Sequence, residues 1–82
     1  MYHLYILTCA DGTLYTGIAL DIKARVKEHN SSTLGAKYTR TRRPVYLSYS
    51  KEFLDRSSAS REEYRVKQLS RDAKLQLIKT NE

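Results

Sequence analysis

Two short apolar runs with a turn between them constrain the fold of this chain more than any other feature. Residues 2–9 read Y-H-L-Y-I-L-T-C and residues 14–20 read L-Y-T-G-I-A-L, and both runs contain the aromatic and β-branched residues that favour strands. The four residues between them, A-D-G-T, include Asp and Gly, which favour turns. The pattern therefore predicts a β-hairpin at the start of the chain.

Side chains alternate between the two faces of a strand, so each run has an apolar set and an aromatic set. The apolar set consists of Leu4, Ile6, Leu14, Ile18 and Leu20. These side chains share a face only if the loop has an odd number of residues, as in a three-residue turn with Gly12 in the left-handed conformation. Tyr5 and Tyr15 then lie together on the other face, where Gly17 leaves an open surface for a ligand or another backbone.

A short amphipathic helix is expected after the hairpin. Asp21 is a favourable N-cap, and residues 22–29, I-K-A-R-V-K-E-H, have helical spacing before N-S-S at residues 30–32 ends the helix. Arg25 and His29 lie beside or on the stripe that should face the hairpin, which is unfavourable unless they serve a polar cleft. Alternatively, Arg25 extends its charge to water and His29 is a hydrogen-bonded boundary residue; the spacing leaves both open.

The segment 31–44 has no regular apolar period and interleaves basic residues with an aromatic one. Its candidate nucleic-acid contacts are Lys37, Tyr38, Arg40, Arg42 and Arg43. Basic residues around an aromatic ring can contact phosphates while the ring stacks on an unpaired base. The alternative is a solvated loop with Tyr38 packed on the core. We expect phosphate contact, because 15 Lys and Arg against 9 Asp and Glu give a formal charge of +6, although solubility alone also explains such an excess.

A third strand and two helices are expected in the rest of the chain. Residues 45–50, V-Y-L-S-Y-S, alternate as in a half-buried strand, with Val45, Leu47 and Tyr49 on the inner face. The following helix runs to Leu69, and the last one spans residues 71–80. The expected fold is α/β (α+β): a small three-stranded, mainly antiparallel sheet flanked by helices, in the order β-β-α-β-α-α.

Glu63 is a candidate metal ligand on the first of these two helices. It shares a stripe with Ala59 and Val66, so its carboxylate lies in line with the buried face. If that helix began at Ser60 rather than at Asp55 or the serines after it, Glu63 would only complete a capping box. The other possibility is a single Mg²⁺ or Mn²⁺ held by one protein oxygen, a substrate phosphate and waters.

The chain length and the cysteine content limit the remaining classes. The 82 residues are expected to form one domain, 1–82, without a separate recognition module. The single cysteine, Cys9, cannot form an internal disulfide, and no Cys/His spacing suggests zinc. Because no signal segment or long apolar run is present, we expect a soluble cytoplasmic protein without a membrane partner.

The ordered motifs L-Y-I, L-Y-T-G and D-I-K-A-R-V-K-E-H resemble the signature of the GIY-YIG nuclease superfamily, specifically its small standalone bacterial members. Residues 3–5 stand where that family has G-I-Y, and residues 15–17 where it has Y-I-G. Arg25 matches the arginine of the first helix, and His29 matches the residue one turn later. The resemblance continues through G-A-K-Y-T-R and E-Y-R-V-K-Q-L, so it covers nearly the whole chain.

The resemblance implies a metal-dependent endonuclease that hydrolyses phosphodiester bonds in DNA, with RNA left open as a substrate. In family mechanisms the tyrosine matching Tyr5 is often the general base, with the residue matching His29 in support and Tyr15 positioning water or phosphate. Arg25 would hold the scissile phosphate. His29 titrates closer to neutrality than a phenol, so the choice of base between Tyr5 and His29 stays open. We further expect a repair-type enzyme that selects DNA structure rather than a long sequence.

Two departures from the family pattern bear on this expectation. His3 replaces the motif glycine, and no asparagine follows Glu63 at the family spacing, because Asn81 lies too near the end. The alternative is a non-catalytic nucleic-acid-binding module or accessory subunit that keeps the nuclease fold. A plain interaction domain is the third possibility.

Overall fold

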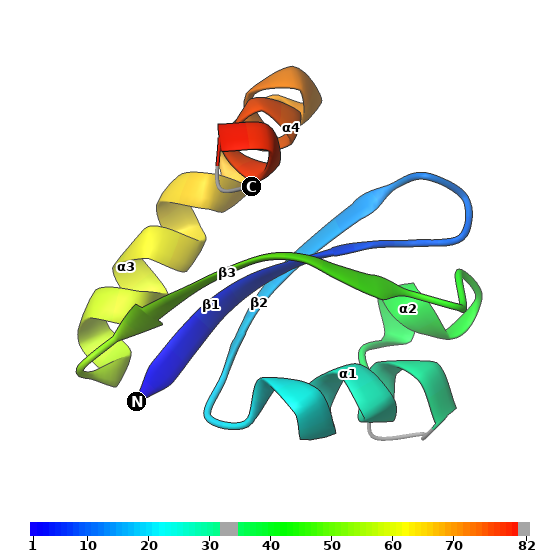
Figure 1. Cartoon of the computed structure of the whole chain (residues 1–82), viewed down its shortest axis with the longest axis horizontal. Helices are drawn as coiled ribbons and strands as arrows, with labels where there is room; N and C mark the ends of the chain where they lie inside the picture. Colours follow the sequence, from blue (N-terminus) through cyan, green and yellow to red (C-terminus); the bar gives the residue numbers. More distant parts are fainter. Residues whose placement is uncertain (32–34, 81–82) are drawn as a thin grey trace.

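The computed structural model describes residues 1–31 and 35–80. Its elements are β1 (Tyr2–Thr8), β2 (Leu14–Ala19), α1 (Ile22–Ser31), α2 (Lys37–Arg40), β3 (Tyr46–Phe53), α3 (Arg56–Lys67) and α4 (Arg71–Thr80). The strands form one antiparallel sheet in the order β2-β1-β3, with α1 and α2 on one side and α3 and α4 on the other (Figure 1). This confirms the predicted α+β architecture.

The hairpin has the predicted register. Leu4 lies opposite Ile18, and Tyr5 lies opposite Gly17, so opposed residues have the same parity. The backbone N–H of Cys9 donates to the carbonyl oxygen of Thr13 at 2.8 Å, which leaves a three-residue turn. Gly12 closes that turn with a φ of 84°, a conformation that residues with a Cβ rarely adopt.

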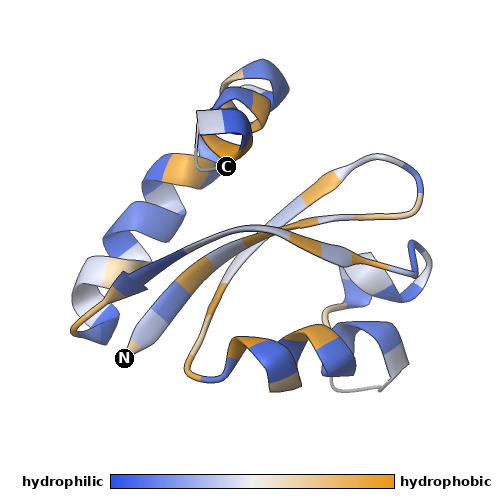
Figure 2. Ribbon diagram, viewed as in Figure 1, coloured by the Kyte–Doolittle hydropathy of each residue, from blue (hydrophilic) through white to orange (hydrophobic). Residues whose placement is uncertain are grey.

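The two faces of the sheet carry separate clusters of buried side chains. The first is built on Leu4, Ile6, Tyr49 and Val66, with Leu14, Ile18, Phe53, Leu69, Leu77 and Ile78 packed around it. The second is built on Tyr5, Leu7, Cys9 and Val45, with Tyr15, Ala19 and Val26 around it. In Figure 2 apolar residues accordingly lie along the strands, whereas the helices alternate apolar and polar residues. The central strand is therefore buried on both faces.

The prediction for the third strand is wrong in one respect. Ile6 pairs with Tyr49 but Leu7 pairs with Leu47, so β3 has one extra residue at Ser48 and the register shifts there. Such a bulge switches the faces of the residues on either side of it. Tyr49 consequently joins the first cluster and Val45 the second, and Leu47 is 45% exposed rather than buried.

Several element boundaries also differ from the predicted ones. Leu20 was expected on the apolar face, but β2 ends at Ala19 and Leu20 is 62% exposed. The segment expected to be irregular contains the one-turn helix α2. The first helix was expected to end at His29 but extends to Ser31, and Ser32, the last of the residues expected to end it, lies outside the described residues.

The start of α3 settles which residue caps that helix. Asp55 is the N-cap, and its carboxylate accepts a hydrogen bond from the backbone N–H of Ser58 at 2.7 Å. A capping box from Ser60 to Glu63 is therefore excluded. Ala59 and Val66 are fully buried on the inner face of this helix, as predicted, and α3 ends at Lys67 rather than Leu69.

No helix in the described ranges is long and apolar enough to cross a membrane.

Removing one methylene group from the first cluster tests its packing. We expect Ile6→Val, at a side chain with no exposed surface, to lower the free energy of unfolding by about 1 kcal/mol, because the lost contact leaves a small cavity. Leu54→Ala is the control: Leu54 is 87% exposed and its removal should change stability by less than about 0.5 kcal/mol. Urea denaturation measures both. Equal losses would show that Ile6 does not contribute to the packed core.

Candidate active site

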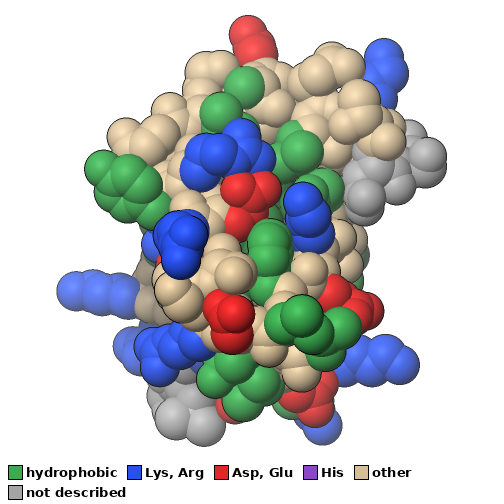
Figure 3. Space-filling model, turned by 90° about the vertical axis from the view of Figure 1, so that its left-hand side faces the viewer, with side chains coloured by type: hydrophobic (Ala, Val, Ile, Leu, Met, Phe, Trp, Pro, Cys, Tyr) green, Lys and Arg blue, Asp and Glu red, His purple; other side chains and the backbone are tan. Residues whose placement is uncertain are grey.

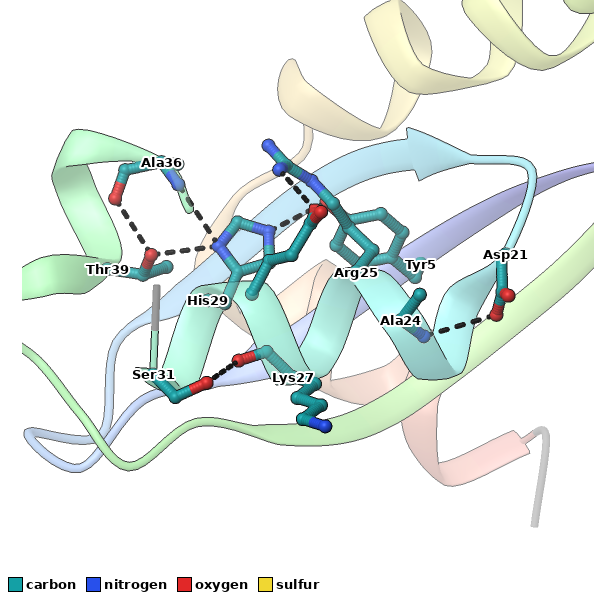
Figure 4. Close-up of polar contacts among 10 residues, drawn as sticks. Tyr5, Asp21, Ala24, Arg25, Lys27, His29, Ser31, Ala36 and Thr39 are labelled. Carbon is teal, nitrogen blue, oxygen red and sulfur yellow. Dashed lines mark hydrogen bonds and ion pairs between the residues drawn. The ribbon is translucent and has the colours of Figure 1, made fainter. Parts of the chain in front are cut away.

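The second face of the sheet places a buried hydrogen bond between the central strand and α1. The hydroxyl oxygen of Tyr5 lies 3.0 Å from Nε2 of His29 (Figure 4). Tyr5 is 1% exposed and His29 is fully buried, so neither group exchanges this bond for water. Tyr15 completes the group, with its ring centroid 6.5 Å from that of Tyr5 and 5.2 Å from that of His29. The prediction that Tyr5 and Tyr15 share a face is confirmed.

Gly17 has a different part in this site from the one predicted. A Cβ atom on Gly17 would lie 2.5 Å from the hydroxyl oxygen of Tyr5 and 2.7 Å from its ring carbon Cζ. The space beside this glycine is therefore not open for a ligand, because the Tyr5 phenol fills it. A side chain at position 17 would displace the phenol from His29.

Arg25 lies between the buried pair and the surface. Its guanidinium hydrogen-bonds to the Tyr5 hydroxyl, and its Nη1 pairs with Glu28 at 3.0 Å. The Arg25 side chain is 29% exposed, whereas Tyr5 and His29 are almost completely covered. Arg25 is therefore the member of the group that a phosphate can reach directly.

Thr39 belongs to the site, although the sequence did not mark it as a candidate. It is fully buried, and its hydroxyl lies 2.8 Å from Nδ1 of His29 and 2.9 Å from the carbonyl oxygen of Ala36. The backbone N–H of Ala36 also donates to Nδ1, at 3.3 Å (Figure 4). The only sequence signal was its place in the motif G-A-K-Y-T-R, beside the basic residues singled out there.

Tyr38 covers the open side of Tyr15. The two rings stack with centroids 5.8 Å apart, and the guanidinium carbon of Arg42 lies 3.9 Å from the centre of the Tyr38 ring. Arg42 also pairs with Asp11 at 3.1 Å, and its backbone oxygen accepts the N–H of Ala10. Arg42 therefore connects the hairpin turn to Tyr38, whose ring stacks on Tyr15.

The predicted basic contacts occupy two kinds of position. Lys37 and Arg40 are exposed on α2. Arg42 makes the internal contacts just described, and Nε of Arg43 donates to the backbone oxygen of His29. Arg42 and Arg43 thus also hold the site together.

Glu63 lies on α3 with its side chain 24% exposed and forms an ion pair with Lys67, Oε2 to Nζ, at 3.2 Å. Its charge also raises the pKa of Tyr5, a smaller effect than burial or Arg25. No three His, Cys, Asp or Glu side chains converge on a possible metal position in the described ranges. The residues therefore fit only a cation held by one protein oxygen, as Mg²⁺ often is, with waters and substrate completing its shell.

Burial sets the protonation of the central pair. The pKa of His29 is lowered to about 4, first by desolvation and then by the charge of Arg25; Glu28 opposes this shift, and Arg43 adds a smaller lowering effect. The pKa of Tyr5 is raised by desolvation, and the hydrogen bond from Arg25 partly opposes this. At neutral pH the pair is consequently an uncharged imidazole and a protonated phenol.

Residues 1–76 match the family described as the GIY-YIG catalytic domain. The chain belongs to the GIY-YIG family. A UPF0213 protein of Desulfotalea psychrophila is 56% identical over 81 residues, covering 99% of this chain and 74% of that protein. A UPF0213 protein of Halobacterium salinarum is 53% identical over 74 residues, covering 90% and 95%.

Solved structures agree with this GIY-YIG assignment. The solution structure of a UPF0213 protein from Bacillus halodurans has a TM-score of 0.62 at 46% identity, covering 98% of this chain and 85% of that one. A protein from Enterococcus faecalis has a TM-score of 0.65 at 42% identity, covering 96% and 83%. GIY-YIG domains are nucleases that generally use a divalent metal, so membership of the family supports a hydrolase acting on nucleic acid as the class of this chain.

The buried His29 predicts a pH dependence of stability. The unfolded chain binds a proton at His29 near pH 6.5, but the folded chain does so only near pH 4. Stability from this group is therefore complete above pH 6.5 and lost as pH falls toward 4, by about 3 kcal/mol.

His29→Gln is the control for this measurement, because glutamine does not titrate and all other groups remain. The difference in unfolding free energy between parent and variant should narrow as the pH falls from 6.5 to 4. Urea denaturation at several pH values measures it. Parallel curves for the two proteins would contradict the assignment.

Proposed function

We propose that this protein is a metal-dependent endonuclease that hydrolyses phosphodiester bonds in DNA. The observation that carries the proposal is the ordered group Arg25, Tyr5 and His29, in which a partly exposed guanidinium covers a phenol that a buried imidazole holds. Membership of the GIY-YIG family supplies the reaction class. The group provides phosphate binding and proton transfer at one point, which phosphodiester hydrolysis requires.

Each residue has a role in this proposal. Arg25 binds the scissile phosphate through its planar guanidinium and stabilises the charge that develops there. Tyr5 takes the proton of the attacking water in its phenolate form, after its own proton has passed to solvent, and His29 holds the Tyr5 oxygen in place. Tyr15, whose ring is edge-on to that of His29, positions water or phosphate beside them.

Glu63 is the proposed ligand of one Mg²⁺ or Mn²⁺ ion. Asp55 rather than Ser60 caps α3, so Glu63 is not required for capping, and its half-buried carboxylate has Lys67 as its ion-pair partner. When bound, such an ion adds positive charge that stabilises the developing negative charge on the phosphate. The positive charge of a bound ion would lower the pKa of Tyr5, against the effect of burial.

The choice of DNA and of structure over sequence rests on the kind of contact available. The proposed interface consists of Lys37, Tyr38, Arg40, Arg42 and Arg43. Contacts of basic side chains with phosphates orient a nucleic acid but carry no sequence information directly. A preference for branched or nicked substrates, and hence a role in repair, is consistent with such an interface. Figure 3 shows that Lys and Arg side chains also lie on the α3 side of the molecule, with acidic ones among them.

A non-catalytic nucleic-acid-binding module is the second candidate. It is favoured by the burial of Tyr5, which is 1% exposed and whose pKa is raised, because a covered and protonated phenol is a poor base. Incubating the pure protein with branched, nicked and single-stranded DNA and RNA, with and without Mg²⁺ or Mn²⁺, decides between the two functions. Binding without metal-dependent cleavage of any substrate would favour the module.

Glu63→Gln separates a metal ligand from a structural residue. The variant keeps the size of the side chain but loses its charge, so we expect it to fold, bind DNA like the parent and cleave roughly a hundredfold more slowly. Glu62→Gln is the matched control, because Glu62 is the neighbouring residue and pairs with Arg65 instead. Melting temperature and cleavage rate are measured on the same samples. A change in stability with an unchanged rate would remove the metal role.

The exposed basic residues of α2 should contribute to the salt dependence of DNA binding. Replacing Lys37 and Arg40 with alanine should reduce the slope of log K against log salt by up to about two. The variant would neutralise fewer phosphates, so fewer counterions would be released on binding. The same double change at Lys74 and Lys79 on α4 is the control. Equal effects on the slope at both positions would mean that binding depends on net charge rather than on this surface.

A further inference from the structure

The hydrogen bonds around His29 determine which of its nitrogens carries the proton. Three polar groups contact the ring: the Tyr5 hydroxyl at Nε2, and the Thr39 hydroxyl and Ala36 backbone N–H at Nδ1. The Arg25 guanidinium hydrogen-bonds to the Tyr5 hydroxyl. The hydroxyls of Tyr5 and Thr39 can either donate or accept. A backbone N–H and a guanidinium can only donate. The roles of the other groups follow from these two donors.

The Ala36 N–H requires an acceptor at Nδ1. It points at this nitrogen at 3.3 Å, so Nδ1 must keep its lone pair, and in a neutral ring the proton is then on Nε2. The Thr39 hydroxyl has one proton, which it can donate to Nδ1 at 2.8 Å or to the Ala36 carbonyl oxygen at 2.9 Å. When it donates to Nδ1, that carbonyl still accepts the backbone N–H of Thr39 at 3.1 Å. The opposite tautomer would direct two N–H groups at each other and leave a buried donor without an acceptor.

We propose that His29 is a fixed hydrogen-bond donor, held as the Nε2–H tautomer by the Ala36 N–H and by Thr39, which is its positioning residue. Nε2–H and the Arg25 guanidinium then both donate to the Tyr5 oxygen. The proton of Tyr5 points away from both donors, and its loss leaves an oxyanion that already accepts two hydrogen bonds. The low pKa of His29 agrees with a ring that stays neutral. The consequence for cleavage rests on the function proposed above, but the tautomer does not.

This assignment also decides between the two candidate bases. His29 has no exposed surface, and in this tautomer its remaining lone pair accepts hydrogen bonds from the segment 36–39. It therefore has no free lone pair with which to take a proton from water. Tyr5 is left as the base, and His29 and Thr39 act through it.

Nitrogen NMR of the ¹⁵N-labelled protein tests the tautomer independently of any cleavage. The chain has two histidines, and the His29→Gln variant identifies the signals of His29. Between about pH 7 and about pH 5 we expect a protonated Nε2 and a bare Nδ1. A ring protonated at Nδ1, or at both nitrogens, would overturn the proposal.

Two variants of Thr39 test its positioning role. Thr39→Val has nearly the same shape but no hydroxyl, so we expect a mixture of tautomers in the spectrum and cleavage about tenfold slower. Thr39→Ser keeps the hydroxyl and should restore both. A single Nε2–H tautomer and a parental rate in Thr39→Val would show that Thr39 does not position His29.

Substitutions of His29 itself distinguish a donor from a base. Glutamine can donate a hydrogen bond but cannot accept a proton, whereas leucine does neither. We expect His29→Gln to cleave within about tenfold of the parent and His29→Leu to lose at least about a hundredfold. Equal losses in both folded variants would show that basicity is needed and would refute the donor role. Absence of cleavage by the parent would refute the proposed function while the NMR result still decides the tautomer.

Discussion

The buried hydrogen bond between Tyr5 and His29 is the contact on which the rest of this structure depends. It joins the central strand to α1 across a face of the sheet that is otherwise apolar. Tyr5 lies opposite Gly17, so the phenol reaches His29 only because β2 has no side chain at that position. One phenol therefore links both strands of the hairpin to the first helix. Because a buried polar group without a partner is unfavourable, the two partners require each other.

The members of the site are arranged by depth. Arg25 is partly exposed, Tyr5 lies beneath it, and His29 and Thr39 have no exposed surface. Arg25, the charged member, lies where a phosphate can reach it. Burial lowers the pKa of His29 and so keeps the imidazole neutral. A site of this kind binds an anion at its surface while its interior only fixes geometry. His29 and Thr39 then act by fixing the position of the Tyr5 phenol and not by carrying a charge themselves.

The two helical sides of the sheet contribute differently to this arrangement. On the α1 side, Gly35 packs against the backbone of Glu28 and His29, which brings Ala36 and Thr39 within reach of the ring. On the α3 side, capping by Asp55 sets the phase of the helix, so that Val66 faces the core and Glu63 lies half-buried one turn before Lys67. The candidate metal ligand is thus positioned by a cap two turns away.

The local periods of the sequence determined the hairpin, its register, the shared face of Tyr5 and Tyr15, and the existence of α1, α3 and α4, because strand alternation and helical spacing depend only on near neighbours. They also singled out Arg25, His29 and Glu63 as polar groups on inward stripes. Tertiary structure alone decided the bulge at Ser48, the exposure of Leu47, the filling of the space beside Gly17 and the place of Thr39. Each of these depends on contacts between residues that are distant in the chain, such as Thr39 with His29 or β3 with β1, and neither residue of such a pair carries a local pattern that marks its partner.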